Sequence, residues 1–255
     1  MDFSLIAIGL FVGFLVGLTG VGGAALLTPI LIMLGIQPTI AVGTDLVYNS
    51  ITKIFGAIQH WRQRTVHWQI ALYFAIGSVP SAVVAVNLIQ WVEHTFGGAD
   101  TLIKKVLGFA LILIPIAMIA KTVLHKREPR PNRWQLCGLK EKRTLTISTG
   151  AVLGFIVGLT SIGSGSLFAL ALMYFFNLQG KEVVGTDIAH AFFLVTAAGL
   201  AHASFGTVDY PIVLQLLFGS VPGVFIGSIL STRVPTRFLQ YTISMIILIS
   251  GLKLI

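Results

Sequence analysis

Two short stretches combine glycines with hydroxyl side chains in a pattern that could bind a small anion. Residues 17–25 read GLTGVGGAA, and residues 158–166 read GLTSIGSGS. Glycine costs about 1 kcal/mol relative to alanine inside a helix, so each stretch is expected to interrupt one. A helix that begins after such a break offers unpaired N–H groups and partial positive charge, and glycine lets an anion approach them closely. The competing interpretation is close helix packing through small residues.

The breaks supply most of the candidate substrate-binding residues, whose neutral N–H and O–H donors suit a small anion. These candidates are Thr19, Gly20, Gly22, Gly23, Thr160, Ser161, Gly163, Ser164, Gly165 and Ser166.

A duplicated acid follows each break, in the sequence VGTD at residues 42–45 and 184–187. A carboxylate would repel an anion directly, so Asp45 and Asp187 are candidates for orienting donors or for carrying a coupling proton or sodium ion. Equally, each could be a helix-start carboxylate that the helix dipole favours. His190, three residues after Asp187, is a candidate proton carrier.

Lys53 lies near the middle of an apolar segment, where a charge is costly and usually functional. It could pair with a carboxylate or contact the anion. Asn49 precedes it by one helical turn, and Thr44 and Thr186 could also face the ligand. These four residues complete the candidate substrate-binding set.

The composition defines the class of protein that must position these residues. Of 255 residues, 55% are hydrophobic and 10% are charged, against roughly 25% charged in an ordinary globular domain. The chain is therefore predicted to be an all-α polytopic membrane protein. The expected helices are 3–18, 24–34, 40–60, 68–91, 102–120, 145–160, 167–176, 183–203, 210–230 and 238–254.

The first two expected helices form one broken element, which has two possible arrangements. Each helix is shorter than the roughly 20 residues that a crossing needs, and together they are too long for one crossing. Either they form a re-entrant hairpin, or one crossing is followed by a half-helix packed inside.

The second half of the chain repeats the first at an offset of 141–142 residues. GFLVGLT at 13–19 matches GFIVGLT at 154–160, VGTD recurs, and GSVP at 77–80 returns at 219–222. We therefore expect two homologous membrane repeats, 1–122 and 144–255, joined by a basic loop at 123–143. Each repeat would contain one broken or re-entrant helix pair and three transmembrane helices.

Loop charges favour an inverted second repeat. Residues 121–143 carry eight basic and two acidic residues, which by the positive-inside rule places this loop in the cytoplasm of a plasma-membrane protein. Arg62 and Arg64 then also lie inside. Their counterparts in the second half are absent, while Arg233 and Arg237 occupy the next loop, as inversion predicts. A basic loop between spans is a topology signal, so no nucleic-acid partner is expected.

The remaining partners follow from what the chain contains. Cys137 is the only cysteine, so neither an internal disulfide nor a cysteine-based metal cluster can form, and we expect no metal or cofactor. The expected partners are the bilayer, a small anion, a coupling H⁺ or Na⁺ and, in a homo-oligomer, other copies of the chain. The leading hypothesis is a non-enzymatic transporter. The alternatives are an intramembrane enzyme using Asp45, Asp187 and His190, or a membrane scaffold.

The motifs GLTGVGGAALLTP at 17–29, AVGTDL at 41–46, GLTSIGSGSL at 158–167 and VGTDIAHA at 184–191 resemble those of the TauE/SafE family of sulfite exporter-like membrane proteins. The resemblance covers nearly the whole chain and implies secondary transport of sulfur-containing anions such as sulfite, sulfonates or related organic acids. Many members of the family have serine where Asp45 and Asp187 stand here.

Overall fold

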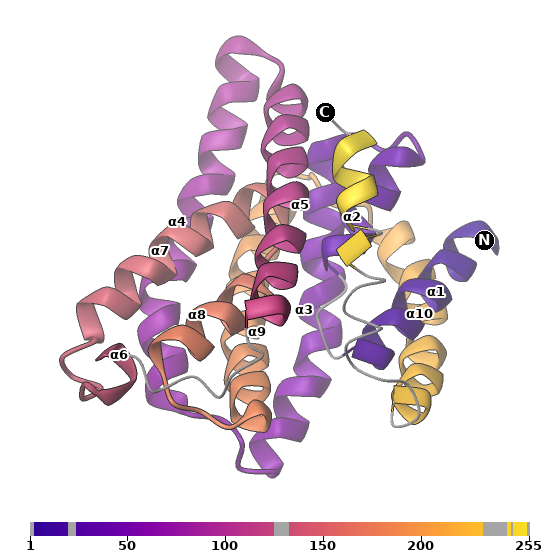
Figure 1. Cartoon of the computed structure of the whole chain (residues 1–255). Coiled ribbons are helices and arrows are strands. Elements are labelled where there is room, and N and C mark those ends of the chain that lie inside the picture. Colours follow the sequence, from indigo (N-terminus) through magenta and orange to yellow (C-terminus); the bar gives the residue numbers. More distant parts are fainter. Residues whose placement is uncertain (1–2, 20–23, 125–132, 232–243, 246, 254–255) are drawn as a thin grey trace.

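The computed structural model is helical throughout its regular structure over the residues it describes, which are 3–19, 24–124, 133–231, 244–245 and 247–253 (Figure 1). In chain order the helices are α1 (Phe3–Thr19), α2 (Ala24–Met33), α3 (Pro38–Arg62), α4 (Trp68–Phe96), α5 (Ala99–Leu124), α6 (Arg133–Leu136), α7 (Arg143–Thr160), α8 (Leu167–Phe175), α9 (Gly180–Ser204) and α10 (Tyr210–Ser231). The all-α prediction is confirmed for this part of the chain. The helix expected at 238–254 lies partly outside it, and residues 247–253 are helical.

Most predicted helix ends fall within a few residues of the observed ones, but the expected end of α4 at Trp91 was wrong. The helix continues to Phe96, because nothing between these residues interrupts it. It ends at Gly97, which has φ +66° and donates its N–H to the Glu93 carbonyl at 3.1 Å. Glycine adopts this left-handed conformation without strain.

Four of the described helices are long and apolar enough to cross a membrane, namely α4, α7, α9 and the stretch Tyr210–Gly227 of α10. The shorter α1 is also apolar. α3 is 25 residues long but carries buried Asp45, Asn49 and Lys53. These polar side chains face the interior of the bundle, while apolar residues of the same helix, including Ile54 and Phe55, are exposed.

The centre of the molecule is the pair α3 and α9, which run antiparallel (Figure 1). Near the start of α3, Gly43 lies against His202 at the end of α9. At mid-length the hydroxyls of Ser50 and Thr196 share a hydrogen bond of 2.7 Å. Positions that correspond in the two halves of the sequence thus face opposite ends of the bundle.

The outer helices pair across the two halves, and glycines allow the close approach. α1 packs in parallel on α10, and α7 packs in parallel on α4. A Cβ atom added at Gly219 of α10 would lie 2.0 Å from the Ile6 carbonyl oxygen of α1. One added at Gly77 of α4 would lie 2.0 Å from the Ile147 carbonyl oxygen of α7. Small residues at membrane helix interfaces let backbones meet in this way.

The short helix α8 turns back beside α7. Lys142, which precedes α7, donates from its ammonium to the carbonyl of Phe175 at 3.1 Å, and this residue ends α8. The Gln135 amide donates to the carbonyl of Met173 at 3.0 Å. The start of α7 and the end of α8 consequently lie at the same end of the bundle, and two side chains from the 133–142 segment satisfy carbonyls that the end of α8 leaves open.

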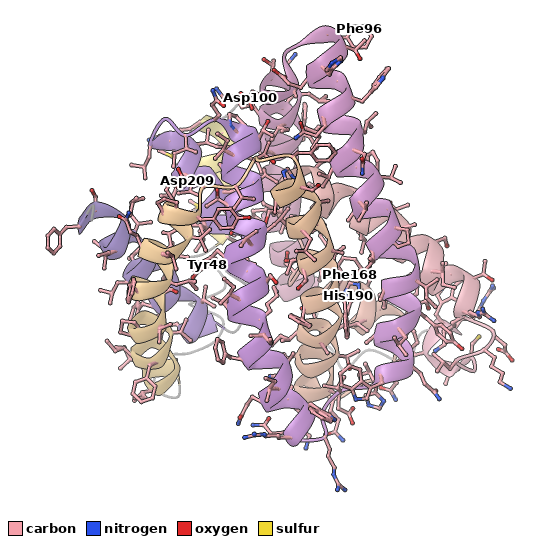
Figure 2. The ribbon with its side chains drawn as sticks, turned by 180° about the vertical axis from the view of Figure 1, so that it is seen from behind. Tyr48, Phe96, Asp100, Phe168, His190 and Asp209 are labelled. Carbon is pink, nitrogen blue, oxygen red and sulfur yellow. The ribbon has the colours of Figure 1, made fainter. Side chains whose placement is uncertain are left out.

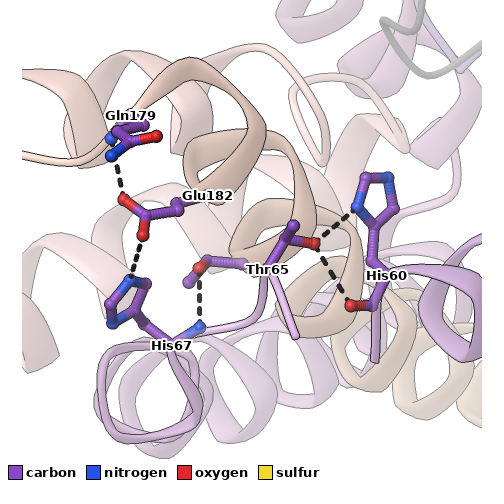
Figure 3. A network of polar contacts seen from close by, with 6 residues as sticks. His60, Thr65, His67, Gln179 and Glu182 are labelled. Carbon is purple, nitrogen blue, oxygen red and sulfur yellow. Dashed lines mark hydrogen bonds and ion pairs between the residues drawn. The ribbon is translucent and has the colours of Figure 1, made fainter. Parts of the chain in front are cut away.

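Contacts between loops define the two ends of the bundle. At one end, His67 Nε2 lies 3.3 Å from Glu182 Oε1, so the 63–67 turn meets the start of α9 (Figure 3). At the other end, the Thr39 N–H donates to Asp100 Oδ1 at 3.0 Å, which joins the start of α3 to the start of α5. The loop at 133–142 lies at the first end, and the turn at 205–209 lies at the second.

Candidate functional site

The second break is a buried, tightly turned segment between α7 and α8. Ser161 and Gly163 both have left-handed backbones, with φ of +62° and +98°. Glycine suits this conformation, whereas Ser161 holds it at an energetic cost. Gly163 accepts at its carbonyl from the N–H groups of Ser166 and Leu167, which starts α8. Gly165 completes the turn. The prediction that residues 161–166 interrupt the helix is confirmed.

Gly20, Gly22 and Gly23 lie outside the described residues, and for Thr19 only its position as the last residue of α1 is defined.

Two hydroxyls in the second break are fully buried, those of Ser161 and Ser164. Within the described part of the chain, neither Oγ forms a hydrogen bond. The Ser161 hydroxyl faces the Asp45 carboxylate without reaching hydrogen-bond geometry. Buried polar groups are normally satisfied, so unpartnered ones point to a ligand or water.

The other hydroxyls of the break have structural roles or stand at the helix start. Thr160 Oγ1 donates to the Ile156 carbonyl at 2.7 Å and accepts from the Ile162 N–H at 3.2 Å. Ser166 stands at the N-cap of α8 without capping it through its side chain. In the first turn of α8, the N–H groups of Phe168 and Ala169 have no hydrogen-bond acceptor among the described residues.

Asp45 is buried and well supplied with donors. Thr28 of α2 donates to Oδ2 at 2.5 Å, and the Asn49 amide donates to Oδ1 at 2.6 Å. Asn49 also bonds the Asp45 carbonyl at 2.9 Å. Asn49, predicted as a substrate ligand, thus holds a carboxylate in place. Thr28 was missed by the sequence analysis, because a threonine in a short apolar helix gives no signal of its contact.

Asp187 has the equivalent position in α9 but a different environment. It is 4% exposed, and its buried Oδ1 has no hydrogen-bond partner among the residues that the structure describes. The repeat alignment explains the difference, since Ala169 replaces Thr28 and Ala191 replaces Asn49. Both donors that hold Asp45 are therefore alanines beside Asp187.

Lys53 is the buried cation that acts on both carboxylates. Its side chain is buried in α3, 7% exposed, and lies within electrostatic range of Asp45, Asp187 and His190. It forms no hydrogen bond or ion pair in the part of the chain that the structure describes.

His190 completes the cluster from α9. Its Nε2 and the Ser78 hydroxyl share a hydrogen bond of 2.8 Å, while its buried Nδ1 has no partner over the described ranges. The ring lies 4.2 Å from the Phe168 ring, which links the cluster to the first turn of α8 (Figure 2). Ser78 belongs to the repeated GSVP motif, which the sequence analysis used only to align the halves.

Thr44 and Thr186 lie at opposite ends of the α3–α9 pair. Thr44 Oγ1 accepts from the Asp209 N–H at 3.0 Å, and Thr186 Oγ1 accepts from the His67 N–H at 3.0 Å. Figure 3 shows the end where Thr186 lies, at which Thr65 bonds both the ring and the carbonyl of His60. These two threonines join the halves to each other.

A pocket of about 520 Å³ lies away from this cluster, at the turn between α3 and α4, where Trp61, Arg62, Arg64, Val66 and Trp68 line it. Its aromatic and basic lining is typical of a membrane boundary. We place the candidate site at the buried cluster, where Lys53 lies within electrostatic range of Asp45, Asp187 and His190.

The fold and the cluster define a class of protein. It is a multi-pass integral membrane protein with buried ionisable side chains on its two central helices, α3 and α9. Intramembrane ionisable residues usually mark a substrate or ion pathway.

The chain belongs to the sulfite exporter TauE/SafE family, whose model matches residues 5–254. It is 59% identical to the "Probable membrane transporter protein YjnA" of Bacillus subtilis, with all of both chains covered. It is 26% identical to the "Probable membrane transporter protein YdhB" of the same organism, over 98% of this chain and 99% of that one. A "Sulfite exporter TauE/SafE family protein 2" of Arabidopsis thaliana is 28% identical over 43% of this chain and 24% of its own length. No solved structure matches. The protein is thus a multi-pass membrane transporter of the plasma membrane.

Proposed function

We propose that the protein is a secondary transporter that moves a small, sulfur-containing anion by alternating access around the buried cluster. The observation that carries this proposal is the buried Lys53 ammonium within electrostatic range of Asp45 and Asp187, with the Ser161 hydroxyl of the second break beside Asp45. Together with the open N–H groups at the start of α8, this ammonium and this hydroxyl offer the donors that a sulfite or sulfonate group needs.

We further propose that the two repeats, 1–122 and 144–255, are inverted relative to each other. The antiparallel packing of the corresponding helices α3 and α9 supports this arrangement. The exchange of outer helices supports it as well, because α1 pairs with α10 just as α7 pairs with α4. Inverted repeats with a central site are a common architecture of secondary transporters.

In this proposal α7 and α8 form a re-entrant pair. Lys142 bonds the end of α8, so this broken element enters and leaves at one end of the bundle. Its half-helix then directs its N-terminus at the cluster from within the membrane. Unwound backbone at this depth is tolerated where it is buried in protein or lines a cavity.

Cysteine accessibility tests the inverted arrangement. In a Cys137→Ser background, Gln63→Cys is expected to react with an impermeant maleimide from the cytoplasm, and Phe205→Cys from outside. Both positions are exposed and lie at opposite ends of the bundle. Labelling of both from the same side would contradict inversion.

Transport itself is tested with the purified protein in proteoliposomes. We expect labelled sulfite or an alkanesulfonate to accumulate when a proton or sodium gradient is imposed, and protein-free liposomes give the background. Absence of uptake and of exchange under every gradient would overturn the transport proposal for these anions. Asp45, Asp187 and His190 are the proposed carriers of the coupling ion.

A further inference from the structure

We propose that Asp187 and the transported anion compete for the ammonium of Lys53, so that each anion is carried together with one proton. This inference rests on the proposed function. It selects a single coupling residue from the candidates and specifies H⁺ as the coupling ion.

The two repeat-related carboxylates differ in how firmly they are held. Asp45 accepts from Thr28 and Asn49, so its negative charge is stabilised whether or not Lys53 is near. Asp187 has alanines at both equivalent positions and one oxygen with no donor. Among the described residues, the Asp187 carboxylate therefore depends on Lys53 for its stabilisation.

Packing of α3 on α9 brings the two groups together. Gly56 lies against Ile188, and the hydroxyls of Ser50 and Thr196 meet at 2.7 Å. Lys53 is three residues from both Ser50 and Gly56, so it projects from the same face of α3 toward the Asp187 region of α9.

In the part of the chain that the structure describes, one cation acts on Asp187. This charged group is Lys53 from α3. Lys53 in turn interacts electrostatically with Asp45 of its own helix and with His190 of α9. The buried residues of α4, α7 and α8 are uncharged. Their contribution to the cluster is the Ser78 hydroxyl on His190 and the Phe168 ring.

Because the Asp187 carboxylate and the transported anion share one ammonium, binding of the anion is linked to binding of a proton. When Asp187 is ionised, its carboxylate balances the positive charge of the Lys53 ammonium. A sulfonate entering the site would then add uncompensated negative charge. When Asp187 takes up a proton, Lys53 is released and can bind the sulfonate. A monovalent anion and one proton then move as an electrically neutral pair, which avoids carrying net charge through the membrane interior.

The proposal predicts how affinity depends on pH. Binding of an anion that requires one proton strengthens as pH falls, and above the titration of Asp187 it weakens by about tenfold per pH unit. Methanesulfonate is a suitable probe because it stays ionised across this range, and sulfite is measured beside it. Asp187→Asn is expected to bind at one affinity at every pH.

The experiment uses the full chain in detergent, with binding followed by calorimetry between pH 5 and 9. Asp45→Asn is the matched variant, expected to keep the pH slope even where its affinity changes. Proton uptake by the wild type in weak buffer provides a second readout that needs no variant, with one proton expected per anion bound.

The outcomes separate this inference from the transport proposal. A pH slope that persists in Asp187→Asn, or binding without proton uptake, would overturn the competition and leave anion transport standing. Failure of both probes to bind the wild type at any pH would instead overturn the proposed substrate class.

Discussion

Replacing Lys53 with methionine is expected to abolish transport and to weaken anion binding by about 10- to 150-fold. A hydrogen bond to a charged group contributes roughly 1.5–3 kcal/mol, and 1.4 kcal/mol corresponds to a factor of ten. Methionine preserves the unbranched apolar stem in its buried position and removes only the ammonium. Equilibrium binding of methanesulfonate at pH 5, followed by uptake into proteoliposomes, measures both effects.

Loss of stability must be separated from loss of binding in this variant. Removing Lys53 takes the positive charge away from buried carboxylates, and an uncompensated buried charge typically costs about 3–5 kcal/mol. The double variant Lys53→Met with Asp187→Asn neutralises both groups. It is expected to recover thermal stability and to remain unable to bind the anion. Restored binding would show that the anion does not contact Lys53.

Substitution of Gly219 with leucine is expected to prevent stable folding. The new Cβ would lie 2.0 Å from the Ile6 carbonyl oxygen and 2.7 Å from the Leu10 amide nitrogen, both backbone atoms that rotamer changes cannot move. The cost should exceed the roughly 1–3 kcal/mol of ordinary overpacking, since α1 and α10 must separate. Fluorescence-detected gel filtration of the detergent extract measures the loss of the monodisperse peak.

Gly180→Ala is the matched control, because a Cβ atom at that position meets nothing within 4 Å. It should give the wild-type elution profile and thermal stability. A monodisperse, transport-active Gly219→Leu protein would contradict the close packing of α1 on α10.

The sequence was sufficient to predict where the helices lie, but not which helices pack against each other. Long apolar segments and their glycine and proline punctuation were sufficient to locate the helices, and the break at 161–166 followed from glycine content. The exchange of outer helices between halves was not predicted. It depends on which glycine faces meet in space, and a repeat pattern alone does not determine that.

The candidate site shows the same limit at the level of single residues. Lys53, Asp45, Asp187 and His190 were identified because ionisable groups are rare in apolar segments. The difference between Asp45 and Asp187 in hydrogen-bond donors was not predicted, although the repeat alignment places Ala169 at the position of Thr28. The contact between Thr28 and Asp45 joins residues 17 positions apart across a turn, so only the folded chain shows that this alanine removes a donor.

The pairing of α1 with α10 has a consequence for biosynthesis. Gly13 of α1 packs against Ser220, about 200 residues later in the chain. At roughly 5–20 residues per second, a ribosome needs about 10–40 s to make the partner of a helix that has already left it. Throughout that interval α1 must remain in the bilayer with lipid against its glycine face. Assembly of the first half is therefore completed only after the second half has been inserted.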